Sequence, residues 1–311
     1  MTTTLPLFWH LSSGSKTERV DASVKLIEAL EKFQSQFGFE DSADTSDNDR
    51  EQDERNKDVL DAMNAPDVSY SIRRLIRGLA SPRESSRLGF AVALTEVRLL
   101  RAPHNVTPDI REQLLSRINT VTCSQVVALI LDSSKRQGSM TGQEERDILF
   151  ARLFGLTAVI QSALLVRVTP LPSSASSTTQ ASSFSSYQDV LSQLMAAAEK
   201  KSWLRESAWW AIMLGVDKLQ NSNVPWKETA IDDTIQNIFV GDKTWSPEKI
   251  AMALKLQGMC PDKDWQKLMA PPFKDPDPLS TGNLAVLARI LKVLLFPIHP
   301  AQCSADVVTV I

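Results

Sequence analysis

Five arginines lie close together in this chain, and their chemistry suits the binding of anions. They are Arg73, Arg74, Arg77, Arg83 and Arg87. A guanidinium group is a planar fork of N–H donors that matches phosphate and carboxylate oxygens. The group therefore predicts contact with nucleic acid or with an acidic protein partner. The alternative is that these arginines pair with Asp and Glu of the same fold, or only solvate its surface. The helix neighbour Glu84 favours such pairing for Arg87, whereas we expect Arg74 to make the external contact.

The elements that carry these arginines are expected to be two amphipathic helices joined by a tight turn. In the first helix, apolar residues recur at helical spacing, with Arg73, Arg74 and Arg77 outside that stripe. The stripe comprises Val68, Ile72, Leu75, Ile76 and Leu79. Ser81 and Pro82 predict the start of the second helix, with Ser81 as its cap and Pro82 at its first position. A hairpin of this kind cannot bury its stripe alone, so it must stack on neighbouring helices.

Carboxylate pairs are the next candidates for chemistry, because nucleotidyl transfer needs acidic side chains that hold two Mg²⁺ ions. The close pairs are Asp232–Asp233, Asp262–Asp264 and Asp275–Asp277. We expect the first two pairs at or near helix starts, where carboxylates favour the helix dipole, and the third in a proline-containing loop. Neither tyrosine of the chain stands before paired aspartates as in a polymerase motif. The sequence therefore predicts no catalytic residues and no enzyme.

Metal and cofactor sites are not predicted either. The cysteines Cys123, Cys260 and Cys303 are widely spaced, form no CxxC pair and lie far in sequence from the three histidines. We expect them to be reduced thiols. No glycine-rich phosphate loop and no GxSxG elbow is present. The most apolar late stretch, residues 284–296, is broken by Arg289 and Lys292, so no membrane helix is expected, and the amino terminus does not read as a signal peptide. No small-molecule substrate is expected.

Six blocks of the sequence, in order along the chain, carry a family resemblance. They are FWHL at 8–11 with the helix that follows, SIRRLIRGLASPRESSRLGFAVALTE at 71–96, RDILFARLFGLTAVIQSALL at 146–165, KSWLRESAWW at 201–210, WSPEKIAMALKLQ at 245–257 and NLAVLARILK at 283–292. The chain resembles the DNA polymerase phi family, to which fungal DNA polymerase V and the animal Myb-binding protein belong. Members of that family are longer, so the chain resembles an amino-terminal portion.

The resemblance implies a function that composition alone would not indicate. It implies a non-enzymatic nucleolar scaffold, located in the nucleus and nucleolus, that supports ribosomal RNA gene transcription and ribosome biogenesis. Implied partners are ribosomal DNA or pre-ribosomal RNA and nucleolar proteins. Two alternatives stay open: a corepressor that binds transcription factors, and a DNA-directed DNA polymerase, for which the metal-binding carboxylates are missing.

The fold class that we expect is all-α, a superhelical array of antiparallel helical hairpins of the HEAT or armadillo kind. Helical periods dominate, including one long apolar helix over residues 144–168, and connections are mostly short. Two segments are expected to be disordered. Residues 40–56 are acidic and polar, and residues 169–186 hold eight serines and three threonines without any charge. The predicted domains are a lobe over 1–168, a linker over 169–186 and a second lobe over 187–311, which continues in longer relatives.

Charge and aromatic residues are unevenly distributed between these parts. The net charge is −3, but residues 40–61 alone carry −7, which leaves +4 on the remainder. That balance is far less basic than in a dedicated nucleic-acid domain. Six of the seven tryptophans fall in the second lobe: Trp203, Trp209, Trp210, Trp226, Trp245 and Trp265. We expect them to be buried between helices, and a peptide-binding groove is the alternative.

Overall fold

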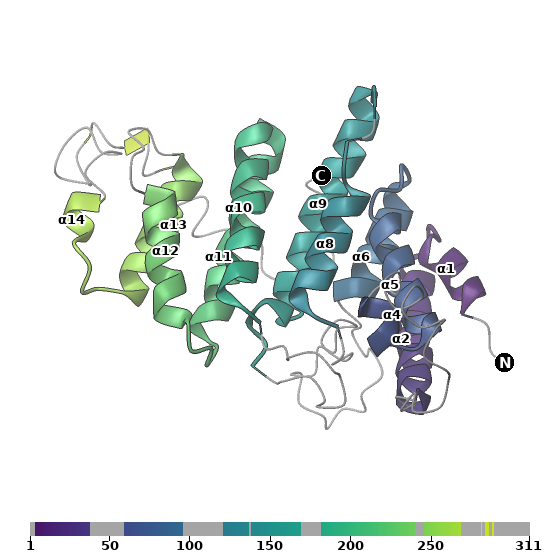
Figure 1. Ribbon diagram of the computed structural model, residues 1–311. Coiled ribbons are helices and arrows are strands. Elements are labelled where there is room, and N and C mark those ends of the chain that lie inside the picture. The colour runs from purple at the N-terminus through teal and green to yellow at the C-terminus, as the bar shows by residue number, and fades with distance from the viewer. Residues whose placement is uncertain are drawn as a thin grey trace, which may run out of the picture. The chain divides into compact units, whose positions relative to one another are not determined.

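The computed structural model describes residues 4–37, 59–95, 121–136, 138–168, 182–239 and 246–268, with four isolated positions between 281 and 288. Every regular element in these ranges is helical, and no strand occurs in them, which confirms the all-α class (Figure 1). The expected disordered segment 40–56 and most of the segment 169–186 lie outside the described residues. Within the described ranges, no helix is long and apolar enough to cross a membrane.

The chain divides into two compact units, residues 1–197 and 198–311. The first unit holds these helices: α1 (Leu5–Leu11), α2 (Lys16–Gln36), α4 (Val59–Met63), α5 (Pro66–Gly78), α6 (Glu84–Thr95), α8 (Cys123–Ser133), α9 (Gly142–Gln161), the 3-10 turn η1 (Leu164–Val166) and most of α10 (Phe184–Lys200). The second holds α11 (Ser202–Gln220), α12 (Lys227–Phe239), α13 (Pro247–Met259) and α14 (Trp265–Leu268).

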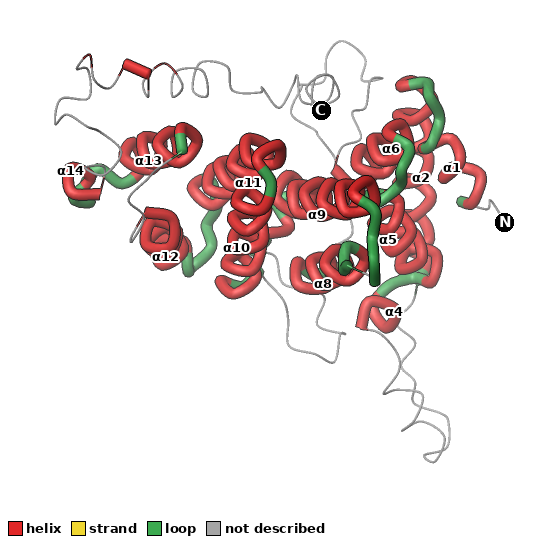
Figure 2. The backbone as a smooth tube through the Cα atoms, turned by 90° about the horizontal axis from the view of Figure 1, so that it is seen from above, coloured by secondary structure: helices red, strands yellow, loops and turns green. Residues whose placement is uncertain are grey.

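The hairpin of α5 and α6 is the centre of the first unit. The α5 stripe predicted from the sequence is confirmed, because Val68, Ile72, Leu75, Ile76 and Leu79 are all buried. Helix α5 packs on α6 and on α8, α6 packs on α9, and α8 packs on α9, so one helical pair lies beside the next (Figure 2). Helices α1 and α2 cover the free side of α6. In the second unit, α11 packs on both α12 and α13.

Three helix boundaries differ from the sequence prediction. Helix α6 begins at Glu84 and not at Pro82, and the Ser81 hydroxyl accepts a hydrogen bond from the Arg83 amide, before the helix starts. The long apolar helix predicted over 144–168 ends at Gln161, because Ala163 adopts a left-handed backbone conformation with φ of 55°. The chain then continues as η1. Third, α10 starts at Phe184, so the last residues of the predicted linker are helical.

Hydrogen bonds join the chain just before the serine-rich segment to the chain just after residue 181. The Ser182 amide donates to the Arg167 carbonyl at 2.9 Å, and the Arg167 amide donates to the Ser182 hydroxyl at 2.7 Å. That hydroxyl donates in turn to the Leu164 carbonyl at 2.7 Å. The two chain segments that flank residues 169–181 therefore meet at Arg167 and Ser182. Whether this segment separates two lobes, as the sequence suggests, stays a prediction.

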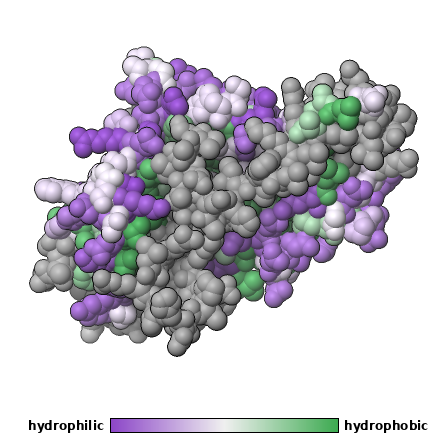
Figure 3. Space-filling model, turned by 180° about the vertical axis from the view of Figure 1, so that it is seen from behind, coloured by the Kyte–Doolittle hydropathy of each residue, from purple (hydrophilic) through white to green (hydrophobic). Residues whose placement is uncertain are grey.

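Hydrophilic residues cover most of the described surface in the view of Figure 3, and hydrophobic residues appear there as separate small patches. Some large apolar side chains are nevertheless exposed, among them Leu5 and Trp9 on α1. Scattered single residues of this kind are normal on folded proteins. The apolar faces of the helices described above are therefore used mainly for packing inside each unit.

The backbone of α6 comes very close to the end of α1, and Gly89 makes this approach possible. A β-carbon at Gly89 would overlap the backbone carbonyl of Leu11. We expect Gly89→Ala to lower the free energy of unfolding by about 1–3 kcal/mol, because α6 would have to move away from α1. Thermal unfolding followed by circular dichroism would measure the change.

Gly142→Ala is the matched control, because nothing lies within 4 Å of a β-carbon at that position, which is also in a helix of the first unit. Equal melting temperatures for the two variants would show that α1 and α6 are not in close contact.

Candidate functional site

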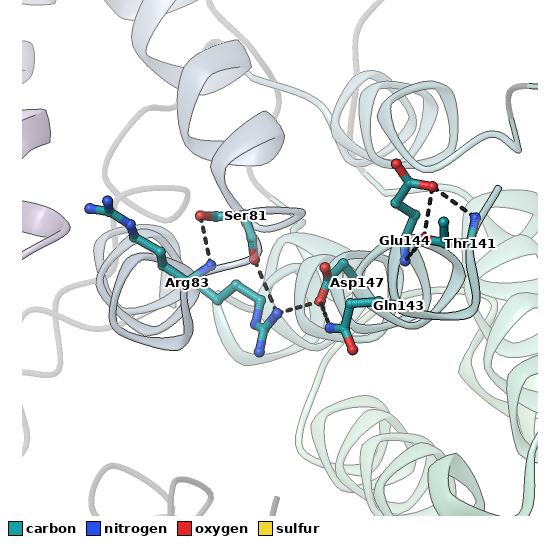
Figure 4. A network of polar contacts seen from close by, with 7 residues as sticks. Ser81, Arg83, Thr141, Gln143, Glu144 and Asp147 are labelled. Atoms are coloured by element: carbon teal, nitrogen blue, oxygen red, sulfur yellow. Dashed lines mark hydrogen bonds and ion pairs between the residues drawn. The ribbon is translucent and has the colours of Figure 1, made fainter.

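Arg87 points into the first unit and not toward solvent. Its Nη1 atom donates to Oδ1 of Asp147 on α9 at 2.5 Å and to the carbonyl of Ser81 at 3.0 Å (Figure 4). The two side chains are only 14% and 8% exposed. The guanidinium carbon also lies 5.3 Å from the centre of the Phe150 ring. Arg87 therefore joins α6 to α9, and its partner is Asp147 and not Glu84, the neighbour that the sequence suggested.

The first turn of α9 holds Asp147 in place. Thr141 caps the helix through a capping box in which its hydroxyl accepts from the Glu144 amide and the Glu144 carboxylate accepts from the Thr141 amide. The hydrogen bonds that the Thr141 amide and hydroxyl donate to this carboxylate lower the pKa of the Glu144 carboxyl. One turn later, Oδ1 of Asp147 accepts a second hydrogen bond, from the Gln143 side chain at 3.0 Å. The buried carboxylate is thus satisfied by two donors from different elements.

Arg73 also forms an ion pair inside the first unit. Its Nη1 and Nη2 atoms donate to the two carboxylate oxygens of Asp61 at 2.7 and 3.0 Å. This bidentate geometry is the strongest that an arginine and a carboxylate can make. Because Asp61 belongs to α4, the pair fastens this short helix to α5.

Arg74 lies over aromatic rings. Its guanidinium carbon is 4.4 Å from the centre of the Phe8 ring and 5.8 Å from that of Tyr70. Its Nη1 atom donates to the Tyr70 hydroxyl at 2.7 Å. Tyr70 meets Phe8 edge-on, with an angle of 87° between the rings. A cation over aromatic faces is held in position without losing its charge.

Arg77 and Arg83 are exposed. In Figure 4 the guanidinium of Arg83 points away from the polar network around Asp147. The positive charge of Arg77 reaches α8, where it contributes to lowering the pKa of Asp132 after the larger effect of the hydrogen bond and charge of Lys135. Within the described ranges, neither Arg77 nor Arg83 forms an ion pair with a carboxylate. The five arginines thus separate into two that are paired with carboxylates, Arg73 and Arg87, and three that are not paired within the described ranges.

An open pocket of about 620 Å³ lies over the outward side of α5. Its α5 residues are Pro66, Tyr70, Arg73, Arg74 and Arg77. Phe37, just after α2, and Asp61 of α4 complete the lining. Three of the five sequence-predicted site residues therefore meet in one concavity, whereas Arg83 and Arg87 do not line it. We call this concavity the α5 pocket.

Sequence reasoning missed four residues that define this region: Phe8, Phe37, Asp61 and Tyr70. The spacing of Tyr70 and Arg74, four residues apart on one helix, was a signal that they could touch. No comparable local signal exists for Asp61 or Phe37, because they reach α5 from other segments of the chain.

The carboxylate pairs are engaged in separate local contacts. Asp232 forms an ion pair with Lys263 at 2.6 Å, and Asp233 accepts a hydrogen bond from Asn237 at 2.9 Å. The expectation that this pair lies near a helix start is wrong, because α12 begins at Lys227. Asp264 directly precedes α14, and its carboxylate accepts from the Lys267 amide. Asp275 and Asp277 lie outside the described residues.

The cysteines and tryptophans can be placed in part. Burial raises the pKa of the Cys123 thiol to about 12, which keeps it protonated at neutral pH. In the part of the chain that the structure describes, no three His, Cys, Asp or Glu side chains gather as metal ligands. Trp209 and Trp265 are buried, Trp210 and Trp226 are half-buried, and Trp203 is 44% exposed. Trp245 and Cys303 lie outside the described residues.

Comparison with known proteins identifies relatives over nearly the whole chain. The sequence profile of the DNA polymerase phi family matches residues 70–299. The chain is 25% identical over 291 residues to the rDNA transcriptional regulator pol5 of Schizosaccharomyces pombe, which covers 93% of this chain and 24% of that relative. It is 30% identical over 295 residues to the rDNA transcriptional regulator POL5 of Saccharomyces cerevisiae, covering 92% of this chain and 25% of the relative.

The chain thus spans about a quarter of the length of these curated relatives. No solved structure matches it.

The inward position of Arg87 leads to a stability prediction. Arg87→Gln leaves the Asp147 carboxylate buried without its cation, so we expect the free energy of unfolding to fall by about 3 kcal/mol. Urea unfolding followed by circular dichroism, in the transition of the first unit, would measure this loss.

Arg83→Gln removes the same charge from an exposed position close by in the sequence and should change stability by no more than about 0.5 kcal/mol. If both variants unfold at the same urea concentration, Arg87 does not stabilise the contact between α6 and α9.

Proposed function

The chain belongs to the DNA polymerase phi family, and we propose that it acts as part of a non-enzymatic nucleolar scaffold for ribosomal RNA gene transcription and ribosome biogenesis. The observation that carries this proposal is the match of more than nine-tenths of the chain to two proteins that are named as rDNA transcriptional regulators. In this proposal the chain corresponds to the amino-terminal portion of its longer relatives.

The packing of the first unit supports a scaffold built from stacked hairpins. The pair α5 and α6 lies beside the pair α8 and α9, with contacts between α5 and α8 and between α6 and α9. This is the neighbour-to-neighbour contact of HEAT and armadillo arrays, and we propose that the chain forms such a superhelix. An array of this kind offers extended surfaces to several partners.

A non-enzymatic role is supported by the state of the described carboxylates. Asp232 and Asp233 have different partners, a lysine and an asparagine, and among the described residues no group of three His, Cys, Asp or Glu side chains is placed to hold a metal ion. A DNA-directed polymerase would need carboxylates that converge on metal ions. The names of the two relatives also describe regulators of transcription. A corepressor that binds transcription factors is the alternative that the experiment below separates from the scaffold.

The surface that we propose for nucleic-acid or acidic-partner contact is narrower than the five arginines suggest. Arg73 and Arg87 are committed to Asp61 and Asp147. Arg74, Arg77 and Arg83 keep positive charge at the surface of the first unit. Of these, Arg74 and Arg77 are the residues that we propose for contact with ribosomal DNA or pre-ribosomal RNA, because they share the α5 pocket, whereas Arg83 does not line it.

An affinity purification tests the proposal directly. The full chain, tagged and expressed in budding yeast, would be recovered from nuclear extract with and without nuclease, and its partners read by mass spectrometry and quantitative PCR. We expect ribosomal DNA or pre-ribosomal RNA to be enriched over an untagged control, with a set of nucleolar proteins retained after nuclease because a scaffold also binds proteins.

Recovery of sequence-specific transcription factors without ribosomal DNA, pre-ribosomal RNA or nucleolar proteins would favour the corepressor. Recovery of none of these classes would contradict both functions.

A further inference from the structure

The α5 pocket has the size of a site for a small ligand or for one unit of a polymer. Its volume of about 620 Å³ falls within the range of roughly 300 to 1,000 Å³ that is usual for ligand pockets. It is open to the surface, and most of its lining comes from the single helix α5. An extended chain that crosses this surface could place one residue in the pocket while its neighbours stay outside.

The pocket carries a net positive charge. Arg73 is neutralised by Asp61, which accepts both of its hydrogen bonds. Arg74 and Arg77 remain without a carboxylate partner in the described ranges. Among the described residues, one of the five N–H donors of Arg74 is used, in the bond to the Tyr70 hydroxyl. The pocket therefore offers two cations whose donors can reach the oxygens of an anion.

The same pocket presents an aromatic surface that is already fixed in position. Tyr70 is 47% exposed, and its ring rests edge-on against the buried Phe8 ring while its hydroxyl is held by Arg74. Phe37 and Pro66 add apolar lining. An aromatic side chain that is exposed yet held by its neighbours suits the stacking of a planar ring, because little conformational entropy is lost on binding.

We propose that the α5 pocket binds one nucleotide of a single-stranded nucleic acid, with the base stacked on Tyr70 and the adjoining phosphates on Arg74 and Arg77. This inference rests on the proposed nucleic-acid contact and specifies its chemistry. Single strands are bound by cations along the backbone together with aromatic rings under the bases, and the α5 pocket combines both. A duplex keeps its bases stacked inside, so it could use the arginines but not Tyr70. An acidic peptide would likewise leave the tyrosine ring without a role.

Fluorescence anisotropy with labelled oligonucleotides tests the inference on the full chain. The probes are a ten-nucleotide uridylate, the matching ten-nucleotide thymidylate, a ten-base-pair RNA duplex and a ten-residue glutamate peptide, each titrated at several salt concentrations. We expect both single strands to bind more tightly than the duplex, and the first two probes tell RNA from DNA. Tyr70→Ala should weaken single-strand binding about tenfold without changing its salt dependence. Tyr70→Phe, which keeps the ring, should bind within about twofold of the original chain.

Arg77→Gln should lower the slope of log affinity against log salt by about 0.7, the value for one phosphate contact on a single strand. Arg83→Gln is the matched control, because Arg83 is exposed but does not line the pocket, and it should leave the slope unchanged. Arg77 is exposed, so its variant tests the pocket even if Tyr70→Ala lowers the melting temperature.

Four results would overturn the inference. The first is equal effects of Arg77→Gln and Arg83→Gln, which would mean diffuse attraction. The second is that the duplex binds at least as tightly as the single strands. This result would agree with the proposed nucleic-acid contact but contradict the binding of a nucleotide in the α5 pocket. The third is binding of the glutamate peptide alone, which would identify an acidic protein partner. If no probe binds, the nucleic-acid contact itself fails together with the pocket.

Discussion

The position of α6 between two sets of neighbours is the constraint on which the first unit depends. On one side, Gly89 brings its backbone against the end of α1, where a side chain would not fit. On another, Arg87 reaches Asp147 on α9 and is shielded from water. A buried ion pair is costly to form and more costly to break, so it specifies which helices meet more than it adds net stability. Because α5 packs on α6, this placement also determines which face of α5 is left for solvent.

That arrangement decides which side chains lie on the outward face of α5. The apolar stripe of α5 is buried against neighbouring helices. The arginines between the stripe positions therefore face other elements or solvent. Arg73 pairs with Asp61, which neutralises one positive charge and holds α4 against α5. Among the described residues, Arg74 contacts aromatic rings and a hydroxyl and pairs with no carboxylate, so its charge is not neutralised. Tyr70, Arg74 and Arg77 therefore line one pocket, which is the surface that we propose for contact with polyanions in an otherwise weakly charged chain.

Much of the helical architecture could be predicted from the sequence, because amphipathic spacing and helix caps are local signals. The stripe from Val68 to Leu79 and the cap at Ser246 both follow from such signals. Most of the contacts that the sequence did not predict are not local. Asp147 is 60 residues from Arg87 in the sequence, and no local pattern near either residue predicts that they pair. The end of α9 depends on the left-handed backbone conformation of Ala163, and no glycine or asparagine stands there to predict it. The pocket draws Phe37 and Asp61 from opposite sides of the acidic segment, so only the folded chain shows that three arginines share it.

We propose that the arginine group serves two purposes: Arg87 holds α6 to α9, and the α5 pocket contacts nucleic acid. Photo-crosslinking of the full chain to a 4-thiouridine oligonucleotide, with the attached peptides mapped by mass spectrometry, is the direct test of the second purpose. We expect crosslinks to concentrate on the peptides around Tyr70 and the α5 arginines, and an excess of unlabelled uridylate to remove them. Crosslinks concentrated on α6 or in the second unit, with α5 unlabelled, would show that nucleic acid does not bind at the α5 pocket.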